Sequence, residues 1–228
     1  MKRRLAAISG VLFGLGVSAC GAPLGVDDAG ARDDAGTSAD AGALDAGDPF
    51  ADRVVWFDAG SGAGFGQDRF PQVVLGPPRG GGAGSGSLDV LSLGREGVIE
   101  LEFTDIVAID GPGVDVVVFE NAFGGFSETG IVSFSDDGVV WYEFGCVPND
   151  LDAGSAGCAG VNSVFSNPNN GISPLDLSVS GGDGFDLHDV GLTRARFVRI
   201  RDSGANTFYG APSGGFDLDA VAVINGAK

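Results

Sequence analysis

The stretch Gly97-Val98-Ile99-Glu100-Leu101-Glu102-Phe103 decides the fold class of this chain. Its valine and two glutamates alternate with an apolar set made of the isoleucine, the leucine and the phenylalanine. Successive side chains of a β-strand point to opposite faces, so this period of two predicts one buried and one solvated face. The segment 195–201 repeats the pattern with arginines outward and apolar residues inward.

Further strand signals lie on both sides of this stretch, and helical periodicity is weak throughout. Residues 114–120 form a near-continuous apolar run, which predicts a strand buried on both faces. Asp136-Asp137-Gly138 separates the predicted strands 131–135 and 139–144, and Asp-Gly is typical of a hairpin turn. Together with predicted strands at 53–57 and 216–224, these signals indicate one all-β domain over residues 51–228, an antiparallel β-sandwich or jelly roll.

One short segment occurs twice. Gly184-Phe185-Asp186-Leu187 is repeated as Gly215-Phe216-Asp217-Leu218, in each case with a valine three residues later. Two copies do not indicate a solenoid, so we expect the phenylalanine and the leucine of each copy to anchor in the core. A turn of helix is expected over 186–192.

The N-terminus carries an export signal over residues 1–19. Lys2-Arg3-Arg4 precedes the apolar run Leu5–Val17, and small residues follow. Val17-Ser18-Ala19-Cys20 resembles a bacterial lipobox, which implies lipidation of Cys20 and anchoring to the membrane. With Gly21 rather than aspartate after the cysteine, the resemblance favours the outer membrane and the cell surface. A plain secretory signal is the alternative, and a membrane-spanning helix is disfavoured because the run is shorter than about 18 residues.

Residues 20–50 read as a disordered linker, because Asp-Ala-Gly recurs four times and large apolar side chains are almost absent. Removing residues 1–19 takes away three basic residues and no acid, so 10 Lys+Arg remain against 31 Asp+Glu, a net charge of −21. Such a chain repels nucleic acid. Divalent cations and neutral ligands suit it better.

Cys146 and Cys158 remain after the proposed lipidation. They are an even number of cysteines in an exported chain, which predicts a disulfide. A cysteine metal site is disfavoured, because no histidine pair or second cysteine pair accompanies them.

Three segments resemble known domains. Residues 133–141 resemble the S-x-DG-x-x-W hairpin of discoidin-type domains, and Ala195-Arg196-Phe197-Val198-Arg199-Ile200 resembles one of their strands. Residues 215–221 resemble the closing strand of those domains and of related carbohydrate-binding modules. The resemblance implies a galactose-binding-like β-sandwich jelly roll. Asp110-Gly111-Pro112-Gly113 and Phe119-Glu120-Asn121 look like features of a bacterial surface-lipoprotein branch of that group.

The chain departs from the discoidin pattern in its cysteines. Discoidin domains are bracketed by terminal cysteines, whereas Cys146 and Cys158 are internal. Binding of lipid headgroups or collagen is therefore not transferred to this chain.

Calcium is the expected metal, because it prefers carboxylate, amide and carbonyl oxygens. In the similar carbohydrate-binding modules a structural calcium uses an aspartate of the closing strand, and Asp219 matches that position. Asp217 and Asp219 are two residues apart and are expected on one strand face. Turn-capping or solvated acids are the alternative. The candidate ligands are Asp110, Asp115, Glu120, Asn121, Asp217 and Asp219.

Sugar binding is the second expectation, because aromatic faces and planar polar side chains in loops grip sugars. The alternative is that the phenylalanines of these loops are buried in the core and that Arg201 forms ion pairs with acidic side chains. Trp56 and Trp141 lie on predicted strands and are expected in the core. The candidate contacts are Phe123, Phe126, Arg201, Asn206, Phe208 and Tyr209.

Catalysis is the weakest expectation. His188 is the sole histidine, so a histidine-rich metal centre is excluded, and it lies in a predicted helical turn. Glycoside hydrolysis by two carboxylates remains a distant alternative. We therefore expect a lipid-anchored, non-catalytic surface protein that binds a glycan. A structural or adhesive protein with a protein partner is the alternative.

Overall fold

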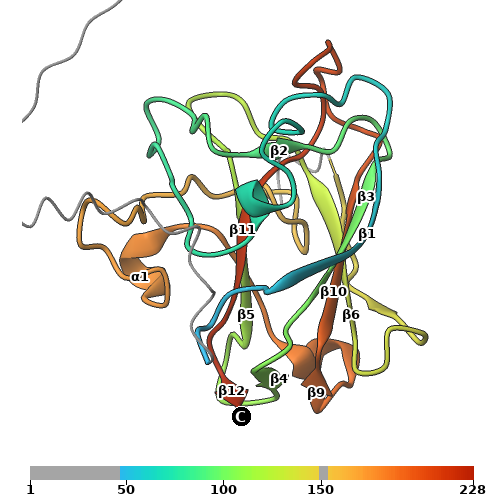
Figure 1. The fold of residues 1–228 in the computed structure, drawn as a ribbon, viewed down its shortest axis with the longest axis vertical. Coiled ribbons are helices and arrows are strands. Elements are labelled where there is room, and N and C mark those ends of the chain that lie inside the picture. Colours follow the sequence, from blue (N-terminus) through green and yellow to red (C-terminus); the bar gives the residue numbers. More distant parts are fainter. Residues whose placement is uncertain (1–46, 149–153) are drawn as a thin grey trace, which may run out of the picture. The chain divides into compact units, whose positions relative to one another are not determined.

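The computed structural model describes residues 47–148 and 154–228, whose strands form three antiparallel sheets (Figure 1). The largest has the order β1-β3-β10-β6-β7, with β1 Arg53–Asp58, β3 Val98–Glu102, β10 Phe197–Asp202, β6 Gly130–Ser135 and β7 Tyr142–Glu143. The second has the order β2-β11-β5-β8, with β2 Leu91–Ser92, β11 Asp217–Val223, β5 Val116–Glu120 and β8 Asp183–Phe185. The third contains β12 Gly226–Ala227, β4 Val107–Ile109 and β9 Arg194–Ala195.

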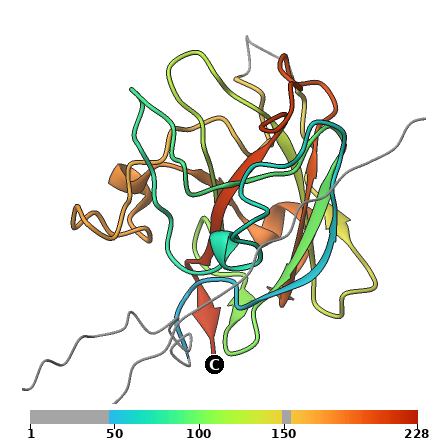
Figure 2. The same cartoon turned by 45° about the horizontal axis from the view of Figure 1, so that its top comes forward.

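The main core lies between the two larger sheets. Ile99 and Leu101 of β3 and Val198 and Ile200 of β10 are fully buried in one cluster with Val118 and Val221 of the other sheet. Side chains from two facing sheets that share one core define a β-sandwich. Figure 2 shows β11 and the strands of the larger sheet as separate layers. The alternation seen in the sequence is thus confirmed.

The four-stranded sheet is covered on its second face as well. Val117, Phe119, Ala220 and Ala222 form a second cluster, against which Leu177 of the short helix α1 Leu177–Ser180 packs. Every residue of β5 and β11 is buried, which confirms the strand predicted to be buried on both faces. Phe50 and Val164 complete this second cluster, and Ile224 packs against it together with Leu177.

The hairpin around Gly138 forms, but its second strand is shorter than predicted. β6 pairs with β7 through Ser133 and Phe134, and Gly138 adopts a φ of 72°, which suits glycine. Asp137 Oδ1 accepts hydrogen bonds from the backbone N–H groups of Val139 and Val140 at 2.8 and 2.9 Å. These two residues are therefore held in the turn and β7 begins at Tyr142.

Short helical turns complete the chain. The 3-10 helix η2 Leu187–Val190 lies within the turn of helix predicted over 186–192. Its N-cap residue is Asp186, whose side chain accepts a hydrogen bond from the backbone N–H of His188. A second 3-10 turn, η1, covers Gln72–Val74. The phenylalanine and leucine of both repeated segments are buried, so their predicted role as core anchors is confirmed.

Two expectations about position are corrected. Trp56 is 47% exposed, and the Trp141 ring lies under the Arg199 guanidinium at 3.9 Å, so neither tryptophan is a core residue. Phe50, which the sequence placed in the linker, forms a bridge to Ala222 and packs against the sheet. The packed domain therefore begins before residue 51. The signal, Cys20 and the linker as far as residue 46 lie outside the described residues.

Cys146 and Cys158 form a disulfide, as predicted. Disulfides persist in oxidising environments, so the bond indicates an extracytoplasmic protein. No helix within the described ranges is long and apolar enough to cross a membrane.

Candidate functional site

The six predicted metal ligands are divided between the two ends of strand β5. Asp115 precedes this strand and Glu120 is its last residue, five positions further on. At about 3.3 Å per residue the two carboxyls are roughly 17 Å apart. Asp217 and Asp219 lie at the Glu120 end, because Leu218 pairs with Glu120 across the sheet. The six candidate ligands therefore do not all surround one ion.

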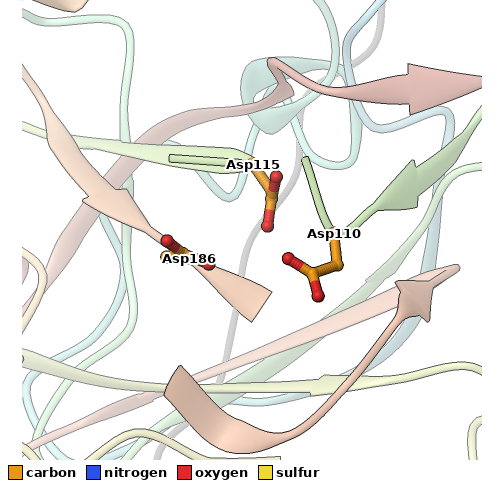
Figure 3. Close-up of side chains that lie close together, drawn as sticks. All are labelled: Asp110, Asp115 and Asp186. Atoms are coloured by element: carbon orange, nitrogen blue, oxygen red, sulfur yellow. The ribbon is translucent and has the colours of Figure 1, made fainter. Parts of the chain in front are cut away.

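At the Asp115 end, three carboxylates lie together (Figure 3). Asp110 follows β4, Asp115 precedes β5 and Asp186 follows β8, and one oxygen of each lies within 4.8 Å of the others. They are the one such group of three or more acidic, histidine or cysteine side chains in the described part of the chain. The three carboxylates can hold a metal ion.

Asp115 also organises the backbone around this triad. Its Oδ1 accepts hydrogen bonds from the Gly111 N–H and the Asn225 Nδ2, both at 2.8 Å. Its Oδ2 accepts one from the Leu187 N–H at 2.8 Å. Because Asp115 is fully buried, these donors are what hold its carboxylate in the protein interior. The carboxylate thus ties the loop between β4 and β5, which carries Asp110 and Asp115, to the segment after Asp186 and to the turn after β11.

Asp186 was missed in the sequence. It belongs to the first copy of the repeated Gly-Phe-Asp-Leu segment, whose second copy supplied the candidate Asp217. The repeat was therefore the signal that could have identified it. The two aspartates lie at opposite ends of the sheet, since Asp186 follows β8 and Asp217 begins β11 beside Asn121.

At the Glu120 end, the loops surround a cavity of about 270 Å³. These loops gather at the top of Figure 1, opposite the three-stranded sheet. Three predicted metal ligands and three predicted sugar contacts line this one cavity. Its walls are Phe65, Ser87, Leu88, Val90, Glu120, Asn121, Phe123, Phe126, Glu128, Phe208, Ser213 and Asp217. We call it the aromatic cavity.

Two carboxyls that line the aromatic cavity are almost wholly buried. Glu120 is 2% exposed, and neither its Oε2 nor Asp217 Oδ1 has a hydrogen-bond partner. Burial, together with the nearby Asp217 and Glu128 carboxyls, raises the pKa of Glu120 well above its usual range. Burial raises the pKa of Asp217 to about 7, although hydrogen bonds from Ser92 and Asn121 oppose the shift.

Glu128 is the third carboxyl of the cavity, and the sequence analysis missed it. Its Oε1 accepts a 3.2 Å hydrogen bond from the Gly215 N–H. Burial, followed by the charge of Asp217, raises the pKa of Glu128 to about 8. No strand pattern marks Glu128, because it lies in the loop between β5 and β6.

Asp219, unlike Asp217, does not line the aromatic cavity. Its two oxygens accept the Arg79 N–H at 3.0 and 2.9 Å. The register of β11 against β5 shifts between Leu218 and Ala220, which disturbs the regular alternation from Asp217 to Asp219. Burial raises the pKa of Asp219 to about 8.

The aromatic residues of the cavity are partly solvent-exposed. The rings of Phe123 and Phe126 stack with their centroids 5.2 Å apart. Phe126 is 59% exposed and Phe208 is 50% exposed, so neither is a core plug. Single exposed apolar side chains are common on protein surfaces, but these two border a cavity that Glu120, Asn121 and Asp217 also line.

The other predicted sugar contacts have structural partners and do not line the aromatic cavity. Arg201 lies 3.4 Å from Glu143 Oε2 on the larger sheet. Asn206 and Tyr209 both donate to the buried Asp202, from Nδ2 at 2.6 Å and from the hydroxyl at 2.8 Å. Asn206 Oδ1 accepts from the Thr129 N–H at 2.6 Å. These residues shape the loop that carries Phe208.

His188 lies beside the acidic triad and not near the aromatic cavity. Its Nδ1 is 3.5 Å from Asp110 Oδ2, and its side chain is 81% exposed. The chemistry available in the cavity therefore comes from carboxyl groups, the Asn121 amide and aromatic rings.

Comparison with known proteins adds no assignment to this geometry. No protein-family model and no curated protein sequence matches the chain.

Proposed function

We propose that this domain binds a glycan, without catalysis, at the aromatic cavity. The observation that carries the proposal is the placement of the exposed rings of Phe126 and Phe208 around one cavity with the polar side chains of Glu120, Asn121 and Asp217. Apolar walls with a few placed polar groups are typical of small-ligand sites. The C–H face of a sugar packs on an aromatic ring, while its hydroxyls bond to carboxyl and amide groups.

The size of the cavity fits a small part of a glycan. Its volume of about 270 Å³ lies at the lower end of ligand pockets. We therefore expect one or two sugar rings to enter, with the rest of the glycan in solvent.

The wider setting of the proposal comes from the sequence. The resemblance to discoidin-type domains and carbohydrate-binding modules supports a galactose-binding-like jelly roll, and the lipobox resemblance supports a lipid anchor at the outer membrane. The disulfide agrees with an exported location. The molecule in this proposal is a surface lipoprotein with a ligand-binding β-sandwich.

Calcium at the acidic triad is the second part of the proposal. Asp110, Asp115 and Asp186 offer only oxygen ligands, which calcium prefers over zinc or copper. At the Asp115 end such an ion would stiffen the loops and would not touch the glycan. Its role is therefore structural.

The test is binding of the purified full-length chain to a glycan array, followed by calorimetry with the strongest hit. Phe126→Ala and Phe208→Ala are each expected to weaken binding about tenfold, since a stacked aromatic ring contributes on the order of 1 kcal/mol or more. The control is Phe165→Ala, which removes a ring of similar exposure, 43%, that does not line the cavity. Unchanged affinity in both cavity variants would refute the site.

Glycoside hydrolysis is a second candidate, favoured by the carboxyls of the cavity. A retaining or inverting glycosidase needs one carboxyl with a raised pKa as its acid and a second carboxylate. Glu128, with a pKa near 8, fits the acid and Asp217 fits its partner. Release of reducing sugar from the array hit, lost in Glu128→Gln, would establish this activity in place of simple binding. If no glycan binds at all, a protein partner becomes the leading alternative.

A further inference from the structure

Two buried acceptor oxygens of the aromatic cavity have no donor. They are Glu120 Oε2 and Asp217 Oδ1, on side chains that line the cavity and are 2% and 8% exposed overall. Buried polar atoms in folded proteins are almost always hydrogen-bonded, so orphaned ones call for a partner. A group that enters the cavity with several donors would supply it.

The cavity holds three acids and no base. Glu120, Glu128 and Asp217 line it, and none of its lining residues is lysine, arginine or histidine. None of the three forms an ion pair with a basic side chain in the described ranges, and Arg69 and Arg79 both pair with Asp89. The raised pKa values of the three carboxyls have the same origin, since burial opposes their ionisation and no cation offsets it. A cationic donor would supply both the missing hydrogen bonds and the counter-charge.

The arrangement fits an ammonium group better than a metal ion. Calcium holds its oxygens at about 2.3–2.6 Å, so oxygens that share one ion lie within roughly 5 Å of each other. The three cavity carboxyls do not converge to that degree, whereas the acidic triad does. An ammonium donates at about 2.8 Å in three directions and can reach oxygens that are farther apart.

The aromatic walls agree with a cation. Phe123, Phe126 and Phe208 border the same space as the carboxyls. The face of an aromatic ring attracts a cation, and the attraction grows when the group is shielded from water. A neutral sugar would use the rings but would leave the acids without a counter-charge.

We propose that the aromatic cavity selects a glycan that carries a free amine, binding the protonated amino group of an amino sugar between its carboxyls and its rings. This inference rests on the proposed glycan function and names the class of sugar. It assigns Glu120, Glu128 and Asp217 to the amine and Phe126 and Phe208 to the sugar face.

At pH 6.5 Asp217 and Glu128, with pKa values of about 7 and 8, are mostly protonated in the free protein, so binding of the ammonium group is expected to release protons. The experiment is calorimetry of the full-length chain at pH 6.5 and 150 mM salt with two probes. One is the β-1,4-linked disaccharide of glucosamine, and the other is its fully N-acetylated form. Because hydrogen bonds between charged groups are about twice as strong as neutral ones, we expect the free amine to bind at least about tenfold more tightly. Glu128→Gln and Asp217→Asn should each reduce this preference to about threefold or less.

Two controls separate the site from general electrostatics. Glu143→Gln removes an acid from the larger sheet, outside the cavity, and should keep the full preference. Thermal unfolding of each variant establishes that it folds. If Asp217→Asn does not fold, Glu128→Gln still tests the inference, because Glu128 is less buried than Asp217.

Each outcome has one meaning. Equal binding of both disaccharides would overturn the amine inference and leave the glycan function in place. Binding of neither would overturn the amine inference, and the glycan array would then decide the glycan function on its own. Binding of spermidine as tightly as the amino sugar would show an amine site without a sugar site, and loss of the preference on adding calcium would show a metal site instead.

Discussion

The Tyr209 hydroxyl donates a 2.8 Å hydrogen bond to Asp202 Oδ1 and accepts one from the Asn206 N–H at 3.0 Å. Asp202 is fully buried and also accepts from the backbone N–H groups of Glu96 and Phe216. One carboxylate therefore joins the end of β10, the loop before β3 and the start of β11. The loop that carries Phe208 depends on this centre.

Loss of the Asp202 carboxylate should destabilise the domain strongly. Asp202→Ala leaves several buried donors without a partner, each of which costs about 1–3 kcal/mol, so we expect a loss of at least 3 kcal/mol. Tyr209→Phe removes one donor and should cost about 1 kcal/mol. Chemical denaturation measures both. Asp68→Asn, on an exposed side chain, is the control and should leave stability unchanged; an equally small effect of Asp202→Ala would contradict the assigned role.

The disulfide should contribute measurable stability. Cys146 and Cys158 close a loop with a sequence separation of 12 residues, for which the chain-entropy model gives roughly 3 kcal/mol. The double variant Cys146→Ser, Cys158→Ser should therefore unfold at a temperature several degrees lower. Reducing agent should lower the midpoint of the parent protein and leave that of the double variant unchanged. Equal midpoints for the two proteins would show that the bond is not stabilising.

Stability should fall as the pH rises from about 4 to about 8. The folded-state pKa values of Asp217, Asp219 and Glu128 are about 7, 8 and 8, above the ordinary value near 4, so the folded protein binds more protons than the unfolded chain between these limits. The stability is fully present below the ordinary value and is lost as the pH passes through the folded-state values.

Asp219→Asn tests this dependence at one position. The amide keeps an acceptor for the Arg79 N–H but cannot ionise. We expect the variant to be more stable than the parent at pH 8, by on the order of 2 kcal/mol, and similar to it at pH 5. Thermal unfolding at both pH values provides the measurement. A parent protein that is more stable at pH 8 than at pH 5 would refute the raised values.

Calcium should stabilise the domain through the acidic triad. An ion that binds only the folded state adds about 2.7 kcal/mol at a hundred times its dissociation constant, which raises the unfolding midpoint by several degrees. A chelator should reverse the shift. Asp186→Asn should abolish it, whereas Asp189→Asn, an exposed acid on the same turn that is outside the triad, should not. If calcium does not raise the unfolding midpoint of the parent protein, the triad does not bind the ion and is a structural cluster of acids.

Cys20 should carry the lipid anchor. Cys20→Ser is expected to abolish metabolic labelling with fatty acid and to release the protein from the membrane fraction, because several acyl chains are needed for firm anchoring. Radiolabelled palmitate and cell fractionation provide the two measurements. Cys146→Ser serves as the control and should keep the label; labelling that persists in Cys20→Ser would refute the lipobox.

The strand predictions that rest on alternation between neighbouring residues are confirmed. Ile99, Leu101, Val198 and Ile200 point into the core as their period of two predicts. Val139 and Val140 belong to the strand 139–144 predicted after the Asp-Gly turn, but the Asp137 side chain accepts hydrogen bonds from their N–H groups and holds them in the turn. Competition from a side chain for backbone donors is not visible in an apolar pattern.

The candidate site was predicted in pieces. Glu120, Asp217 and Phe126 were each singled out, but the acids were assigned to a metal and the phenylalanine to a sugar. The structure places all three around one cavity, while Asp110 and Asp115 lie at the far end of β5 with Asp186. Their grouping depends on which loops meet at each end of the sheet, and spacing along the chain does not encode that.

By itself the sequence determined the class of the fold, the core face of the alternating strands β3 and β10, and the disulfide, because each follows from the period of side chains along a strand or from a count of cysteines. Only the tertiary structure decided which acids are neighbours and which are buried without a partner. Residues far apart in the chain, such as Glu120 and Asp217, meet through the pairing of β5 with β11. Whether such a carboxyl is buried without a counter-charge depends on the side chains that the fold places around it, and neither residue's sequence position shows this.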